Sequence, residues 1–149
     1  MNLRAFRPQD TEEILRLFYD TVHTVNAADY TPQQLDAWAP GNTDGARWQQ
    51  EFLQRKAVVC TEGDVITGFG DIDDSGYLDR LYVHKDYQKR GVATMICDFL
   101  EDGFGEITTH ASITARPFFQ KRGYQTVRRQ EVVRSGIVLV NFVMRKKRP

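Results

Sequence analysis

The sequence lacks the features that mark membrane, secreted and nucleic-acid-binding proteins. No apolar run approaches the length that spans a bilayer, and the first residues contain no apolar signal-peptide region. The only two cysteines, Cys60 and Cys97, lie inside apolar stretches, so no disulfide framework is expected. Lysine plus arginine equals aspartate plus glutamate at 20 each, which gives no general attraction to nucleic acid or an anionic membrane. These absences predict a cytoplasmic protein.

Length and composition are those of one ordinary globular domain. The 149 residues suffice for one continuous core and are too few for two. Apolar residues make up 41% of the chain and charged residues 27%. We therefore expect residues 1–149 to form a single domain.

Hydrophobic periodicity predicts a mixture of strands and helices. Helices are expected after residue 8, after residue 31, and over 46–54, 92–101 and 114–121. Strands are expected over 3–6, 57–61, 65–71, 77–83 and 107–111, after residue 123, and over 137–144. The middle strands are antiparallel in character and the later part is typical of a βαβ unit. The pattern therefore predicts a mixed α/β fold.

The segment 78–94 carries the strongest chemical signal. A strand ends, a basic loop follows, and the loop opens into the helix 92–101, so unpaired amide N–H groups converge on one spot. Gly91 and Ala93 leave the backbone accessible to a phosphate, and Lys89 and Arg90 add positive charge. The loop is neither a Walker loop nor a three-glycine dinucleotide fingerprint. From the residues alone it is either a diphosphate site or an ordinary helix N-terminus.

Two motifs resemble those of the GNAT superfamily of N-acetyltransferases. Residues 88–93, Gln-Lys-Arg-Gly-Val-Ala, are similar to the family's Gln/Arg-x-x-Gly-x-Gly/Ala signature. Residues 115–124 resemble its second motif, a helix followed by Gly-aromatic. The order of predicted elements agrees over nearly the whole chain. The resemblance implies a GNAT fold: a mixed central sheet with antiparallel N-terminal strands, flanking helices, and fourth and fifth strands that splay apart.

The resemblance also implies an acetyl-CoA-dependent enzyme. The backbone of Leu81 and Val83 is expected to pair with the pantetheine arm, and an N–H at or beside Leu81 to polarise the thioester carbonyl. The expected cofactor-binding residues are Leu81, Tyr82, Val83, Gln88, Lys89, Arg90, Gly91, Val92, Ala93, Thr94, Phe118 and Phe119. The implied reaction transfers acetyl directly to a primary amine of a small molecule or peptide in a ternary complex, without a metal.

The chain departs from the family pattern at the expected proton donor. Many members carry Asn before the second-motif helix and, within it, a Tyr that protonates the departing thiolate. Those positions are Ser112 and Phe119 here, and phenylalanine has no proton to donate. Either Ser112, Tyr82, Tyr124 or water replaces the acid, or the thiolate leaves unassisted. The departure also supports an alternative, a catalytically degenerate member that binds acyl-CoA as a sensor or interaction module.

Amine acetylation requires a neutral nitrogen, so a general base is expected. Asp79 is the first candidate, because it lies in an apolar run just before the loop; an ion pair with Arg80 or another basic neighbour is the competing interpretation. His110, near the expected splay, is the second candidate for catalysis or substrate contact. His84 is interpreted as a surface residue.

The family's acceptor pocket is built largely from its first two helices and their connection. His23, Tyr30 and Trp38 fall there, and aromatics with polar tips suit a small ligand cavity. The alternative is that Tyr30 and Trp38 only cap the core. The expected partner is the acceptor amine, and a homodimer is allowed, whereas neither nucleic acid nor a membrane is expected.

Overall fold

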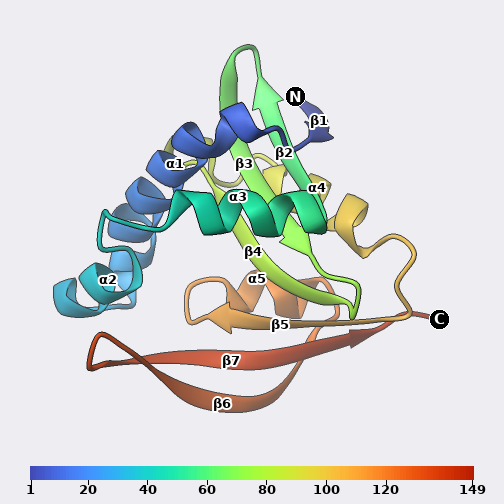
Figure 1. Cartoon of the computed structure of the whole chain (residues 1–149). Helices are drawn as coiled ribbons and strands as arrows, with labels where there is room; N and C mark the ends of the chain where they lie inside the picture. Colours follow the sequence, from blue (N-terminus) through green and yellow to red (C-terminus); the bar gives the residue numbers. More distant parts are fainter.

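A seven-stranded sheet in the order β1-β2-β3-β4-β5-β7-β6 organises the computed structural model, which describes residues 1–149 (Figure 1). All neighbouring strands are antiparallel except β4 and β5. The strands are β1 Asn2–Ala5, β2 Lys56–Glu62, β3 Val65–Ile72, β4 Tyr77–Val83, β5 Glu106–Ser112, β6 Gln125–Arg134 and β7 Ile137–Lys147. The mixed α/β fold expected from the sequence is confirmed.

Helices cover both faces of this sheet. They are α1 Thr11–Thr24, α2 Pro32–Trp38, α3 Gly45–Gln54, α4 Val92–Glu101 and α5 Arg116–Lys121. The starts of α2 and α3 follow their capping residues: the Thr31 hydroxyl accepts the Gln34 N–H, and the Asp44 carboxylate accepts the Arg47 N–H. None of the helices is long and apolar enough to cross a membrane.

Alternation along β2 places one apolar cluster on each face of the sheet. Val59 packs with α1, α2 and α3, whereas Val58 and Cys60 pack with α4 and α5. In Figure 1, α1 and α3 cross in front of the sheet and α4 lies behind it. Helix α4 packs closely on β3 at Gly68, where the absence of a side chain permits the approach. A Cβ at this residue would lie only 2.6 Å from Val92 Cγ1.

Strands β4 and β5 pair only at their beginnings. The parallel register covers Tyr77↔Thr108 and Leu78↔Thr109 and then stops. On its other edge, β4 stays paired with β3 as far as Val83. The splay that the resemblance implied is therefore present, and the edge of β4 from Asp79 to Val83 has no strand partner on the β5 side.

A β-bulge in β4 lies where the splay begins. Asp71 of β3 pairs with Arg80 and Ile72 pairs with Leu78, so Asp79 is an extra residue without a partner in this register. A bulge re-aims the side chains that follow it. Leu78 packs toward α4, whereas Arg80 covers the Trp48 ring of α3, with its guanidinium carbon 4.5 Å from the ring centroid.

Candidate active site

The loop between β4 and α4 has a backbone shape that gathers amide groups. Lys89 and Gly91 both adopt left-handed conformations, with φ of 61° and 82°. The Gln88 carboxamide donates to the Val83 carbonyl at 2.8 Å and so ties the loop to the end of β4. Successive amides around left-handed positions form concave anion sites, and here they lie at the positive end of the α4 dipole.

A groove of about 500 Å³ runs along this loop and into the splay. Of the residues expected to bind the cofactor, the groove is lined by Leu81, Tyr82, Val83, Gln88, Lys89, Gly91, Val92, Ala93, Thr94 and Phe118. Residues that sequence reasoning did not single out for this role complete the lining: Thr21, Val25, Asn26, Tyr87, Ser112, Thr114, Ala115 and Lys121. The groove therefore combines an amide-lined end with an unpaired strand edge.

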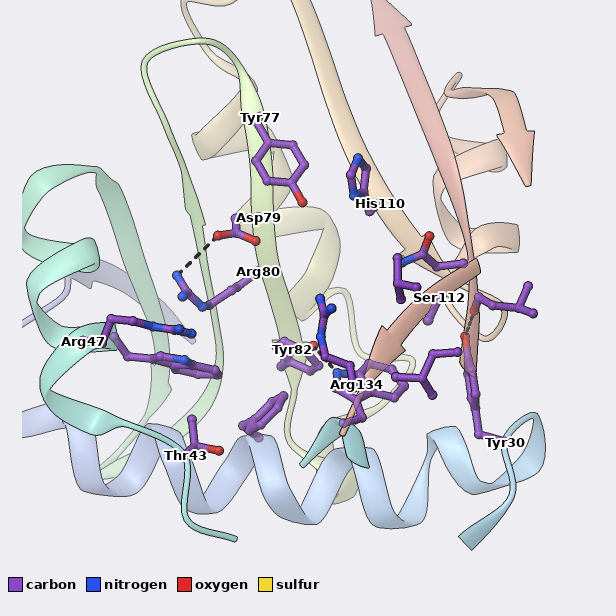
Figure 2. Close-up of a pocket in the computed structure, with 17 residues that line it drawn as sticks. Tyr30, Thr43, Arg47, Tyr77, Asp79, Arg80, Tyr82, His110, Ser112 and Arg134 are labelled. Atoms are coloured by element: carbon purple, nitrogen blue, oxygen red, sulfur yellow. Dashed lines mark hydrogen bonds and ion pairs between the residues drawn. The ribbon is translucent and has the colours of Figure 1, made fainter. Parts of the chain in front are cut away.

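A second cavity of about 450 Å³ lies on the α1–α3 side of the sheet (Figure 2). Its lining includes the expected acceptor residues Tyr30 and Trp38 and the expected catalytic residues Asp79, His110 and Ser112. Tyr82 and Ser112 line both this cavity and the groove. The two spaces therefore meet at the splay, beside the free edge of β4.

Asp79 faces the second cavity as part of a charged network. Its carboxylate accepts a hydrogen bond from Arg55 at 2.7 Å and lies 3.6 Å from the Arg80 guanidinium. The same two arginines bind the fully buried carboxylate of Asp71, and Arg80 also pairs with Glu51. Burial raises the pKa of Asp71 to about 6, so this carboxylate is ionised at neutral pH. The ion pair considered for Asp79 is thus present, and the carboxylate still reaches the cavity.

His110 and Ser112 lie on β5, on the other side of the splay. Burial, followed by the charge of Arg128, lowers the pKa of His110, so its imidazole is neutral at neutral pH, and its Nδ1 lies 3.3 Å from the side-chain nitrogen of Gln130. The Ser112 hydroxyl oxygen accepts the Ala115 N–H at 3.0 Å, which leaves its own proton available for donation. Of these two candidate proton-transfer groups, Ser112 lines both spaces and His110 lines the second cavity alone.

Comparisons with known proteins match this architecture. A family model described as an acetyltransferase (GNAT) domain matches residues 26–146. The chain belongs to the GNAT superfamily of acetyltransferases. It is 34% identical to the uncharacterised N-acetyltransferase YafP of Escherichia coli strain K12, over 99% of this chain and 96% of that protein.

Solved GNAT structures share the fold. A GCN5-related N-acetyltransferase from Rhodopseudomonas palustris superimposes with a TM-score of 0.93 at 32% identity, covering 98% of this chain and 94% of that one. The PaiA N-acetyltransferase of Thermoplasma acidophilum, solved with coenzyme A, gives a TM-score of 0.78 at 15% identity over 98% of both chains.

Two residues that were predicted to bind the cofactor, Arg90 and Phe119, do not line the groove. Arg90 is exposed and lies over the Tyr87 ring, with its guanidinium carbon 5.1 Å from the ring centroid, and it does not line the groove. Phe119 is 3% exposed and packs against Tyr124 in the core, while the preceding Phe118 faces the groove. Adjacent helical side chains point about 100° apart, so the short α5 can present only one of the two phenylalanines.

Of the three residues predicted for the acceptor pocket, Tyr30 and Trp38 line the second cavity and His23 does not. His23 lines neither cavity; its Nε2 lies 2.8 Å from the Ala39 carbonyl and its ring stacks on Tyr19. Tyr30 lines the second cavity, but its hydroxyl donates to the Val140 carbonyl of β7 and accepts from the N–H of Ile113, the residue after β5.

Two tyrosines that were proposed as proton donors differ in how their hydroxyls are bonded: Tyr82 accepts a hydrogen bond, whereas Tyr124 donates one. The Trp38 indole N–H donates to the Tyr82 hydroxyl at 3.2 Å. Burial raises the pKa of Tyr82 well above its ordinary value, so the phenol keeps its proton. Tyr124 is buried on the α4 side and donates to Glu101 at 2.8 Å, and it lines neither cavity.

The second cavity also has lining residues that were not predicted for the site, among them Arg47, Tyr77, Arg134 and Asn141. Asn141 offered a signal, since it is the only amide inside the apolar run 137–144. Its side-chain oxygen is buried without a hydrogen-bond partner. Nothing in the sequence distinguishes Arg47 and Arg134 from other surface arginines.

Proposed function

We propose that the protein transfers an acetyl group from acetyl-CoA directly to a primary amine of a small molecule or peptide in a ternary complex. The meeting of the groove and the second cavity at Tyr82 and Ser112 carries this proposal. The loop amides would hold the pyrophosphate, and the free edge of β4 would align the pantetheine arm. The amine would approach from the opposite cavity. The coenzyme A in the Thermoplasma relative supports the donor assignment.

The proposed reaction needs one base and a place for the thiolate. The neutral amine nitrogen attacks the thioester carbonyl carbon, a C–N bond forms, and the C–S bond breaks. The proton lost by the nitrogen passes to the base, and the departing sulfur takes a proton from Ser112 or water. A backbone N–H on the free edge of β4 would stabilise the negative charge on the carbonyl oxygen.

Asp79 and His110 are the two proposed bases, acting directly or through water. The carboxylate of Asp79 forms ion pairs with Arg55 and Arg80 and still lines the second cavity. His110 is neutral at neutral pH and lies across the splay. Substituting each residue separately distinguishes them, since only loss of the base makes the rate recover at high pH.

A catalytically degenerate acyl-CoA-binding module is the second candidate. It is favoured by the absence of a tyrosine donor: Phe119 has no hydroxyl and is buried away from the groove. Both candidates require acetyl-CoA binding, and only the first requires turnover.

The deciding experiment measures binding and turnover on the same preparation. Calorimetry with acetyl-CoA tests the groove, and release of the free thiol of CoA is followed with a panel of amines. Binding with amine-dependent thiol release supports the transferase. Binding without release for any amine supports the degenerate module, and lack of binding contradicts both.

A further inference from the structure

Two arginines in the second cavity have no charge partner. Arg47 reaches in from α3 and Arg134 from the end of β6 (Figure 2). Neither side chain forms an ion pair. The only hydrogen bond made by either guanidinium runs from Arg134 to the neighbouring Val133 carbonyl, at 3.3 Å. Nearly all the guanidinium N–H groups of Arg47 and Arg134 are therefore free to bind a ligand.

The carboxylates of the site are already committed to other arginines. Asp79 and Asp71 share Arg55 and Arg80, and Glu51 also binds Arg80. No acidic side chain other than Asp79 lines the cavity, whereas Arg47, Arg80 and Arg134 all do. The surface presented to an acceptor is therefore positive, although the whole chain has no net charge.

We propose that the acceptor is an amine that also carries an oxyanion, a carboxylate or a phosphate, held by Arg47 and Arg134. This inference rests on the proposed transferase function and names its substrate class. A guanidinium presents a planar fork of N–H donors that matches the oxygens of carboxylate and phosphate. With the oxyanion on these two arginines, the amine would lie toward Asp79, His110 and the thioester.

The same charges select against polycationic amines. A polyamine or an aminoglycoside would bring several positive charges toward Arg47 and Arg134, and the one acidic side chain in the lining, Asp79, is already paired with Arg55. Like charges brought together in a partly desolvated cavity are unfavourable. A zwitterionic amine avoids this repulsion, because its oxyanion balances the guanidinium groups.

The aromatic side chains that line the cavity favour an acceptor that also has an apolar part. Phe18, Trp38, Trp48 and Tyr82 contribute rings to the lining, next to Leu139. An amino acid or a short amine with an apolar body and an oxyanion fits this mixture better than a small polar amine does.

The test compares matched amines on the parent, Arg47→Gln, Arg134→Gln and the double variant. The probes are amino acids, the corresponding amino acid amides, phosphoethanolamine, ethanolamine and spermidine. Arg129→Gln is the control, because Arg129 is an exposed arginine of β6 that lines neither cavity. Thiol release gives KM and kcat, and calorimetry gives acetyl-CoA affinity for each variant.

Loss of one charge-assisted contact corresponds to an increase in KM of about 10- to 100-fold. We expect that increase for the oxyanion-bearing amine in each cavity variant, with kcat, acetyl-CoA affinity and the amide's KM unchanged. Carboxylate and phosphate probes identify which oxyanion is preferred. Two results would overturn this inference while leaving the proposed function intact. One is a kcat/KM of the parent for amino acid amides or spermidine that equals its kcat/KM for the oxyanion-bearing amines. The other is an effect of Arg129→Gln as large as that of the cavity variants. Binding of acetyl-CoA without turnover of any probe would overturn the proposed function and this inference with it.

Discussion

Replacing Gly91 with valine tests the cofactor groove most directly. Gly91 has a φ of 82°, and a Cβ built there would meet no atom within 4 Å. The open space beside it is the groove that Gly91 lines. The folded chain thus has room for the side chain, and the cost to stability is the left-handed backbone, about 1–2 kcal/mol.

The cost to ligand binding is larger. A branched side chain at residue 91 occupies the place where a phosphate must approach the amides. Losing two charge-assisted hydrogen bonds, at about 1.5–3 kcal/mol each, weakens binding by about 3–6 kcal/mol, which is more than 100-fold. The affinity for acetyl-CoA should therefore fall by at least two orders of magnitude.

Gly103→Val is the matched control. Gly103 has a φ of 91°, a Cβ there also meets no atom within 4 Å, and the residue lines neither cavity. Both variants should melt at a similarly lowered temperature, while calorimetry detects weakened acetyl-CoA binding only in Gly91→Val. Parental affinity in Gly91→Val, or equal loss in the two variants, would refute the assignment of the loop.

Three further substitutions test the chemistry and the packing. If Asp79 is the base, Asp79→Asn should lower turnover by about 10²–10⁴-fold, with partial recovery at high pH. Parental turnover with a lowered melting temperature would mean that Asp79 has only a structural role, through its ion pairs with Arg55 and Arg80. Phe119→Tyr should lose about 1–3 kcal/mol of stability from a buried hydroxyl without a partner and leave turnover unchanged, and raised turnover would contradict its placement in the core. Asn141→Leu removes a buried, unpaired oxygen and should keep or raise the melting temperature, whereas strong destabilisation would mean that this oxygen has a partner in solution.

The elements could be read from the sequence because local signals mark them. The capping residues of α2 and α3 and the glycine before α4 are visible as residue types, and the observed boundaries lie close to the predicted ones. The loop at 88–94 is equally local, since its left-handed positions, its amides and the helix that follows are contiguous in the chain. The family motifs coincide with these same segments.

The second cavity could not be read in this way, because it depends on register and on distant contacts. Asp79 and Arg80 both reach the cavity only because the extra residue in β4 breaks the alternation, and pairing with β3 decides that bulge. Arg47 and Arg134 come from α3 and from the end of β6, so only the complete topology brings them to one space. The choice between Phe118 and Phe119 likewise depends on how α5 packs.

The ordinary pKa values of a thiol and an alkylammonium indicate which step of the proposed reaction needs more assistance. An unassisted thiolate is a reasonable leaving group, since an ordinary thiol has a pKa of about 8.5, and Ser112 or water can protonate it. An alkylammonium with a pKa of about 10.4 is far harder to deprotonate at neutral pH, and it cannot attack until it is neutral. The proposed transfer therefore depends more on deprotonating the amine than on protonating the sulfur, so phenylalanine at residue 119 is compatible with it.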